Sequence, residues 1–324
     1  MTSAPAHVID RFASVGNAPS VVTIGNFDGV HLGHQYLLDQ VTRRARELDV
    51  RPLIVTFEPH PVSVLRPDQP MPRISLPSHK MIAFRKSGIS DVVVVPFDQE
   101  FASLTAEEFL DLVKTYTNPQ EIIVGEGFRF GKARQGDGDY IKDYASRNGF
   151  SATVINRLES EDSIVSSSRI REALSSGNVE RAESLLGRRF RLRGVVERGF
   201  ARGRELGYPT ANLMVVGELL VPDSGIYAGY VHIRNGVQPS RQGLIYIGTS
   251  PTFEPRDRTV EAHILDFDAD LYARNIEVEF VARLRGDEQF ASVEALLDQI
   301  RRDEEQARKI FRETDPESDW KDVT

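Results

Sequence analysis

Near its start the chain has a short apolar run, a glycine-rich loop and an amphipathic segment, in that order. Residues 21–24 are apolar or β-branched and stop at Gly25, which favours a buried strand. Residues 37–48 place their apolar side chains on one helical face. The loop between them, residues 25–34, contains three glycines, two histidines, an asparagine and an aspartate. A helix N-terminus that follows such a loop offers unpaired N–H groups to an anion, so the pattern predicts a phosphate site.

The same alternation continues through the first half of the chain. Further β-branched runs predict strands, and a helix is predicted at 79–87, with another that begins near Thr105. Strands that alternate with helices indicate a parallel sheet with helices on both faces, whose ligands bind beyond the carboxyl ends of the strands. Gly125 and Gly127 resemble a dinucleotide fingerprint, but residues 128–137 are polar and aperiodic, so we reject that interpretation. The predicted strands after the first are 52–57, 91–96, 121–125 and 152–155.

The second half of the chain changes to β-branched runs separated by glycine and proline. Several runs alternate apolar and polar residues with period two, which predicts a small antiparallel barrel. A terminal helix is expected at 292–312, and a polar, disordered tail at 314–324. We therefore expect two domains, residues 1–185 and 186–313. The predicted barrel strands are 191–196, 225–233, 243–247, 259–265 and 275–281.

Composition narrows the class of protein. A chain of 324 residues with 40% hydrophobic and 27% charged residues is suited to two globular domains. The net charge of −8 argues against a general nucleic-acid partner. The absence of cysteine excludes disulfides and thiolate chemistry, and the sequence has neither a signal-peptide pattern nor an apolar run of membrane-spanning length. We expect a soluble cytoplasmic protein without a membrane partner. The sequence gives no indication of the oligomeric state.

Residues 25–34 read GNFDGVHLGH, which resembles the HxGH signature of nucleotidyltransferases and, in its longer form, the bacterial riboflavin kinase/FAD synthetase family. The resemblance implies a doubly wound parallel sheet and adenylyl transfer from ATP, in which a substrate phosphate attacks the α-phosphate directly. His31 and His34 would stabilise the triphosphate charge. A single histidine at a strand end is more often an ordinary surface or core residue. The other nucleotide-pocket residues implied are Gly25, Asn26, Phe27, Asp28, Gly33 and, in a loop that resembles VGxNFRFG, Arg129.

Residues 164–174 contain three serines before an apolar-periodic segment. Taken alone, this is the pattern of a helix N-cap. After the last strand of such a sheet it also resembles the second nucleotidyltransferase signature, ISSTxxR. The resemblance implies that Ser167, Ser168 and Arg171 bind phosphate oxygens. Both signatures occur in the order of the family, which is more specific than either one alone.

Residues 203–212 read GRELGYPTAN, which could form an ordinary turn but resembles the riboflavin kinase signature GRxLGFPTAN. The resemblance implies that Thr210 and Asn212 act as oxygen ligands of Mg²⁺ on ATP, and that Asn212 is also catalytic. Gly203 and Gly207 would let the loop fold over the phosphates. Glu261 matches the glutamate that accepts the ribityl proton, although a lone glutamate on a strand is usually a solvated residue.

The resemblance, from about residue 21 to 311, implies a bifunctional enzyme. Its C-terminal domain would phosphorylate riboflavin with ATP to FMN, and its N-terminal domain would transfer AMP from ATP to FMN, giving FAD and pyrophosphate. The chain departs from the family pattern at Gly127, Ser250 and Ala273, in place of asparagine, asparagine and glycine. If position 273 requires a positive φ, Ala273 is strained or its turn differs. Two alternatives are a paralogue with one activity impaired or a different nucleotide or flavin specificity, and a flavin-binding regulator without catalysis.

Overall fold

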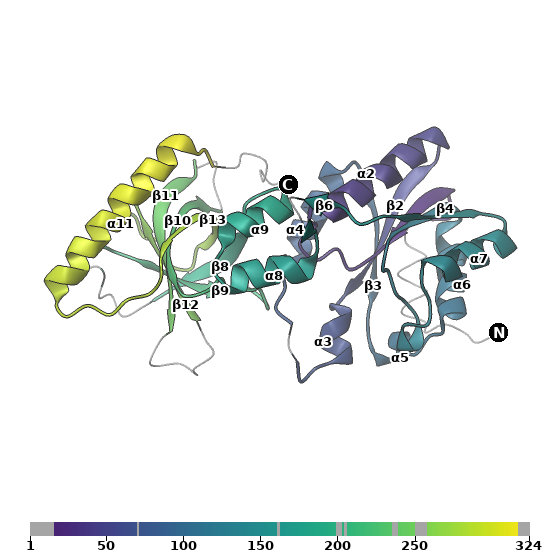
Figure 1. Cartoon of the computed structure of the whole chain (residues 1–324), viewed down its shortest axis with the longest axis horizontal. Helices are drawn as coiled ribbons and strands as arrows, with labels where there is room; N and C mark the ends of the chain where they lie inside the picture. Colours follow the sequence, from purple (N-terminus) through teal and green to yellow (C-terminus); the bar gives the residue numbers. More distant parts are fainter. Residues whose placement is uncertain are drawn as a thin grey trace. The chain divides into compact units, whose positions relative to one another are not determined.

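The computed structural model describes residues 16–69, 71–160, 163–198, 203, 206–234, 239–249 and 258–316. Two compact units can be distinguished (Figure 1). The sheet unit comprises the chain up to Met71 together with Pro77–Val165, and the barrel unit comprises Pro72–Leu76 and the chain from Ser166 onwards. The domain boundary expected between residues 185 and 186 stays a prediction.

The sheet unit contains the predicted parallel sheet, and its five strands have the order β3-β2-β1-β4-β5. The strand order reverses at β1, so the loops after β1 and β4 leave from the carboxyl edge where ligands bind in such sheets. All five predicted strands are present within a residue or two of the expected bounds. They are β1 (Ser20–Ile24), β2 (Arg51–Glu58), β3 (Asp91–Pro96), β4 (Pro119–Gly125) and β5 (Ser151–Ile155).

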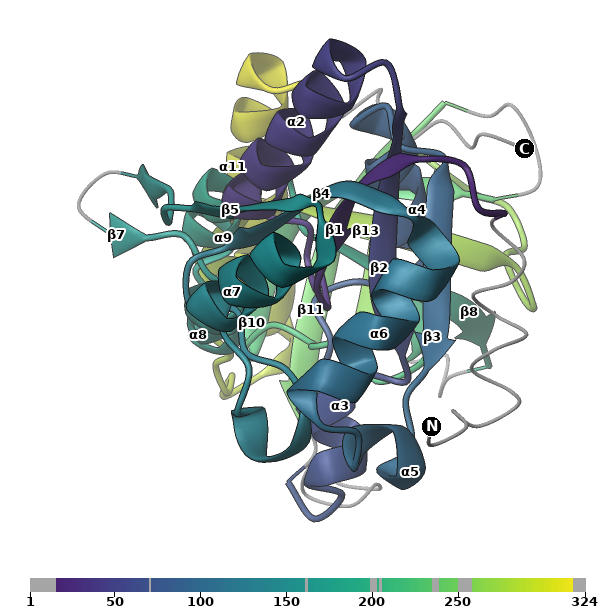
Figure 2. The same ribbon diagram turned by 90° about the vertical axis from the view of Figure 1, so that its right-hand side faces the viewer.

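Helices cover both faces of this sheet. Helices α2 (Leu32–Glu47) and α4 (Pro77–Lys86) pack on one face, where Leu38, Val41 and Phe84 are buried. On the other face α6 (Ala106–Thr117) and α7 (Gly138–Asn148) pack against the sheet, as Figure 2 shows. The short elements of the unit are α3 (Pro61–Leu65), α5 (Gln99–Ala102), η1 (Lys132–Arg134), β6 (Glu159–Ser160) and β7 (Ser163–Ile164).

The sequence indicated the start of α6 but not α7. Thr105 caps α6, and Glu108 completes a capping box, as its position three residues later allows. Helix α7 was not predicted because its buried residues are few, Ile141, Tyr144 and Ala145, in an otherwise charged segment. Its start is nevertheless marked by Asp137, whose carboxylate accepts the N–H groups of residues 139 and 140.

The barrel unit contains a closed antiparallel barrel of order β10-β11-β12-β9-β8-β13, which confirms the predicted architecture. Strand β9 (Ala211–Val215) was not predicted, because Leu213 is its one buried side chain and the hydrophobic pattern is weak. The other strands agree with the prediction. They are β8 (Arg191–Glu197), β10 (Gly225–Ile233), β11 (Arg241–Thr249), β12 (Arg258–Ile264) and β13 (Asn275–Arg285).

Helices α8 (Ser167–Ser175), α9 (Val179–Leu186) and α11 (Val293–Glu313) belong to the barrel unit. Helix α11, which matches the predicted terminal helix, packs Ala307 and Phe311 against buried apolar residues of the barrel strands. Of the tail predicted to be disordered, residues 317–324 lie outside the described part of the chain.

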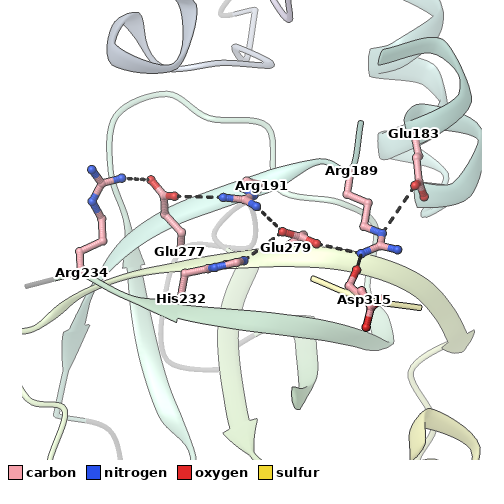
Figure 3. Close-up of polar contacts among 8 residues, drawn as sticks. All are labelled: Glu183, Arg189, Arg191, His232, Arg234, Glu277, Glu279 and Asp315. Atoms are coloured by element: carbon pink, nitrogen blue, oxygen red, sulfur yellow. Dashed lines mark hydrogen bonds and ion pairs between the residues drawn. The ribbon is translucent and has the colours of Figure 1, made fainter. Parts of the chain in front are cut away.

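A buried ion cluster joins α9 and the chain just after α11 to the barrel strands (Figure 3). The Glu279 carboxylate, whose side chain is fully buried, accepts hydrogen bonds from Arg189 at 3.0 Å and from Arg191, and lies 2.9 Å from His232. Arg189 also donates to the backbone carbonyl of Asp315 at 2.6 Å. The cluster is completed by the ion pairs of Glu183 with Arg189 and of Glu277 with Arg234 and Arg191. Removal of one charge would therefore leave others buried without compensation.

Candidate active sites

The glycine-rich loop after β1 ends on His31, which caps helix α2. Its Nδ1 accepts the backbone N–H of His34 at 3.2 Å, taking the place of the usual hydroxyl or carboxylate cap. Because Nδ1 is the acceptor, the ring proton of neutral His31 lies on Nε2, which is then a donor. A Cβ on Gly33 would lie 3.2 Å from His31 Nδ1, so glycine leaves room for this ring.

The two histidines are brought together as the sequence predicts. Their rings stack with centroids 3.6 Å apart and an interplanar angle of 15°. Phe27 packs edge-on against His34 with centroids 5.1 Å apart. Two positively charged rings in this arrangement would repel each other, so an anion is the ligand that would stabilise both in the charged state. Asn26 and Asp28 lie in the same loop, where Asp28 is buried.

The loop has a strained backbone. Phe27 has φ 52° and Val30 has φ 38°, although both are L-residues with bulky side chains and both are buried. A left-handed conformation costs such a residue about 1–2 kcal/mol, and it persists only where the surroundings enforce it. Strain of this kind is concentrated at functional sites, which favours a binding role for the loop.

The loop after β4 carries Arg129, which forms an ion pair with Asp137 at 3.3 Å while both side chains remain partly exposed. The backbone N–H of Tyr140 lowers the pKa of Asp137 below its ordinary value, and the Arg129 charge adds to this effect. Gly127 has φ 82°, and a Cβ there would lie 2.4 Å from the Arg157 guanidinium. The Arg157 guanidinium therefore lies beside residue 127, where the family pattern has asparagine.

Ser167, Ser168 and Arg171 lie in the first turns of α8, and the cap itself is Ser166. Arg171 Nε donates to the backbone carbonyl of Pro72 at 2.9 Å within the barrel unit. Helix α8 belongs to the barrel unit. That its side chains bind the same phosphates as the histidines of the sheet unit therefore stays a prediction.

In the barrel, the predicted kinase residues come together. Thr210 Oγ1 donates to Glu261 Oε2 at 2.9 Å. Asn212 of β9 is the direct cross-strand partner of Glu261 in β12. A threonine hydroxyl from the residue before β9, an asparagine amide from β9 and a carboxylate from β12 thus lie together, and such hard oxygen donors are the kind that Mg²⁺ prefers. Among the described residues, no group of three or more His, Cys, Asp or Glu side chains could hold a metal ion.

The loop before β9 folds back on itself and borders a cavity. Tyr208 N–H donates to the Gly203 carbonyl at 2.7 Å, and a Cβ on Gly203 would lie 2.3 Å from the Tyr208 carbonyl, so glycine is required there. Gly207 has φ 82°. The cavity beside this loop is lined by residues that include Thr210, Ala211, Phe267, Asp270, Leu271 and Tyr272.

Two residues near these sites were not singled out from the sequence. Tyr246 is the cross-strand partner of Glu261, and its hydroxyl donates to Asp287 at 3.2 Å. Burial, with the negative charge of Asp287, raises the pKa of Tyr246 to about 12. In the sheet unit, Lys80 is buried and donates to the backbone carbonyl of Asn26. Neither residue belongs to a recognisable motif, and period-two alternation and helical spacing alone do not distinguish them from neighbouring residues.

Comparison with protein-family models matches each half of the chain to a different model. A model described as FAD synthetase matches residues 14–169, and one described as riboflavin kinase matches residues 186–311. The bifunctional riboflavin kinase/FMN adenylyltransferase of Escherichia coli K12 is 36% identical over 297 residues, 91% of this chain and 94% of that protein. The chain belongs to the bifunctional riboflavin kinase/FMN adenylyltransferase family.

Other relatives agree with this membership. The protein of the same description from Bacillus subtilis is 34% identical and is covered over 96% of its length, with 95% of this chain. The crystal structure of a macrolide-efflux protein from Streptococcus pneumoniae superposes with a TM-score of 0.82 at 31% identity, covering 92% of this chain and 96% of that one. The fold is therefore shared along nearly the whole length of both chains. Within the described residues, no helix is long and apolar enough to cross a membrane.

As a member of this family the chain is a transferase with two activities, riboflavin kinase and FMN adenylyltransferase. It uses ATP to convert riboflavin to FMN and FMN to FAD. The comparisons favour neither the impaired paralogue nor the non-catalytic regulator. Of the three departures from the family pattern, Ser250 lies outside the described residues. Ala273 has φ 58°, so this position does adopt the positive φ that favours the glycine of the family pattern.

Proposed function

We propose that the β1–α2 loop binds the ATP triphosphate for adenylyl transfer, with His31 and His34 as the catalytic groups. The stacked pair at the carboxyl edge of the sheet is the observation that supports this role. Donors on both rings would stabilise negative charge as it moves onto pyrophosphate, while the FMN phosphate attacks the α-phosphorus. The remaining residues assigned to the nucleotide pocket are Gly25, Asn26, Phe27, Asp28, Gly33 and Arg129.

The α8 residues complete the phosphate contacts in this proposal. The hydroxyls of Ser167 and Ser168 and the guanidinium of Arg171 are donors of the type that binds phosphate oxygens. They lie in the first turns of a helix of nine residues, where unpaired backbone N–H groups add to the attraction for an anion. The match to the second nucleotidyltransferase signature is the main support for this assignment.

For riboflavin phosphorylation we assign the proton acceptor to Glu261. The 2.9 Å hydrogen bond from Thr210 to Glu261 supports this role, because it brings the signature threonine beside the carboxylate that would take the ribityl proton. Thr210 and Asn212 would hold Mg²⁺, which would offset the charge of the ATP phosphates when bound. The adjacent cavity, with Phe267 and Tyr272 in its lining, would receive the adenosine part of ATP, under the loop that contains Gly203 and Gly207.

This division assigns adenylyl transfer to residues 1–185 and phosphorylation to residues 186–313. The family-model matches, which end at 169 and begin at 186, are compatible with it. We also propose that the enzyme works in the cytoplasm, because both steps consume ATP.

The experiment is to give riboflavin, ATP and Mg²⁺ to the wild type, to His31→Ala and to Glu261→Ala, and to separate the flavins by chromatography. His31→Ala should accumulate FMN, with FAD formation reduced about 10²- to 10³-fold. Glu261→Ala should leave riboflavin unphosphorylated, with FMN formation reduced about 10²- to 10⁴-fold.

Each variant serves as the control for the other. When FMN is supplied directly, Glu261→Ala should make FAD at the wild-type rate, which establishes that the substitution affects phosphorylation alone and leaves the adenylyl-transfer domain folded. Normal FAD production by His31→Ala, or normal FMN production by Glu261→Ala, would refute the corresponding assignment. Omission of Mg²⁺ with addition of a chelator should stop riboflavin phosphorylation if Thr210 and Asn212 hold the ion.

A further inference from the structure

Helix α4 presents two buried side chains, one turn apart, to the β1–α2 loop. Lys80 is 6% exposed and Phe84 is fully buried. Lysine is almost never buried to this degree unless its ammonium is bonded. The contacts of Lys80 therefore indicate what the loop requires from this helix.

The Lys80 ammonium holds one backbone carbonyl of the loop. Nζ donates to the Asn26 carbonyl at 2.8 Å and to Thr56 Oγ1 at 3.2 Å. The Thr56 hydroxyl lies 3.4 Å from the same carbonyl. Because Lys80 lies on a helix and Thr56 on strand β2, the carbonyl is fixed from two regular elements rather than from the loop itself.

This carbonyl belongs to the peptide that precedes Phe27, the residue with φ 52°. The orientation of that peptide is one factor that sets the Phe27 conformation. Another is its ring, which packs edge-on against Phe84 with centroids 5.5 Å apart and against His34 with centroids 5.1 Å apart. Helix α4 thus holds Phe27 by its backbone through Lys80 and by its side chain through Phe84.

The contacts continue from Phe27 to the paired imidazoles. The ring of His34 lies between Phe27 and His31, in edge-on contact with the first and stacked on the second. If the Asn26 peptide turned, Phe27 could relax from its left-handed conformation and its ring would move away from His34. The orientation of His34 therefore depends on Lys80 through the Asn26 carbonyl and the ring of Phe27.

We propose that Lys80 is a positioning residue for adenylyl transfer. It fixes the Asn26 carbonyl, keeps Phe27 in its strained conformation and so holds His34 in the stack that receives the ATP phosphates. The proposal rests on the function proposed for the two histidines. Lys80 itself contacts neither the substrate nor the reacting atoms in this mechanism.

The test compares Lys80→Met, which keeps an unbranched side chain of similar length but removes its charge and donors, with Lys86→Met. Lys86 is an exposed lysine of the same helix, so the control loses the same charge. With FMN and ATP as substrates, kcat for FAD formation by Lys80→Met should fall about 10- to 100-fold, because misplacement of a catalytic group affects the reacting geometry. Riboflavin phosphorylation should be unchanged in both variants, and Lys80→Arg should recover part of the lost rate.

A second readout separates positioning from simple destabilisation. The imidazole Cε1–H signals of His31 and His34 in the NMR spectrum, assigned with His31→Ala and His34→Ala, report the stacking of the rings and the packing of Phe27. These signals should shift in Lys80→Met and stay in place in Lys86→Met. The signals of His232 and His263, which lie in the barrel unit, should not move in either variant.

An unchanged rate of FAD formation in Lys80→Met would overturn the proposal, as would a reduced rate with unmoved His31 and His34 signals. If Lys80→Met does not fold, Thr56→Val removes one of the partners while the ammonium remains. It should then lower the rate and shift the same signals to a smaller extent, and no change in either would overturn the proposal. Full activity of His31→Ala and His34→Ala would instead refute the proposed function.

Discussion

Replacement of Ala273 by glycine tests whether the barrel contains backbone strain that the sequence pattern indicates. Ala273 has φ 58° and is exposed, and its N–H donates to the Val196 carbonyl at 2.9 Å. The N–H of Arg274 closes the turn by donating to the Leu271 carbonyl, also at 2.9 Å. Ala273 is the third residue of this turn, and a positive φ at that position favours glycine. Ala273→Gly removes an exposed methyl group and leaves both hydrogen bonds in place.

The expected gain is the difference between two opposing contributions. A left-handed conformation costs an L-residue about 1–2 kcal/mol, which glycine does not incur. Glycine loses about 0.5–1 kcal/mol more conformational entropy on folding than alanine. The net effect is a stabilisation of about 0–1.5 kcal/mol with a midpoint near 0.75 kcal/mol, which for a unit of this size raises the melting temperature by about 1.5–3 °C.

The assay is thermal unfolding by calorimetry, with Ala269→Gly as the matched control. Ala269 is exposed in the same loop and is not among the residues of positive φ. Glycine at residue 269 therefore incurs only the entropic cost and should lower the melting temperature. If both variants are destabilised to the same extent, the turn at Ala273 is not strained and the reasoning fails.

Two further predictions concern stability. Glu279→Gln should lower the free energy of unfolding in urea by about 3–5 kcal/mol, because partly buried Arg189 and buried Arg191 lose their shared carboxylate. By contrast, Asp298→Asn in the exposed pair with Arg301 should change it by less than about 1 kcal/mol, and equal effects would contradict the buried cluster. Burial raises the pKa of Tyr227 to about 12. Because the unfolded phenol ionises near pH 10, stability should fall as the pH rises from about 10 to 12, and Tyr227→Phe should reduce that slope in urea titrations at each pH.

Most of the fold follows from local sequence patterns. The parallel strands were predictable because they are continuous apolar runs that end at glycine or proline, as β3 shows at Pro96. Helix α7 and strand β9 were not, because each buries few side chains and depends on the neighbouring elements for its stability. In β9, the pairing of Asn212 with both Glu197 and Glu261 takes the place of a hydrophobic pattern.

The candidate sites were predictable to the extent that motifs contain them. The sequence indicates that His31 and His34 occupy one loop, but not that Nδ1 of His31 caps the helix, which decides the tautomer. It names Thr210 and Glu261 as separate residues of the family pattern, whereas their hydrogen bond depends on the register of β9 against β12. Lys80 and Tyr246 carry no local signal at all, because their contacts come from residues distant in the sequence.

Two loops beside the proposed sites, the β1–α2 loop and the loop between β12 and β13, contain L-residues in the left-handed region, and in each unit a helix outside the loop holds one of them. In the sheet unit, Lys80 of α4 fixes the peptide before Phe27. In the barrel unit, Asp266 has φ 54° beside the cavity, and Arg308 of α11 donates two hydrogen bonds to its carboxylate, at 2.9 and 3.0 Å. Strain that persists in a functional loop requires such external contacts, because the loop alone would relax. Substitutions in α4 and α11 should therefore change the two activities separately, through loop conformation rather than through contact with substrate.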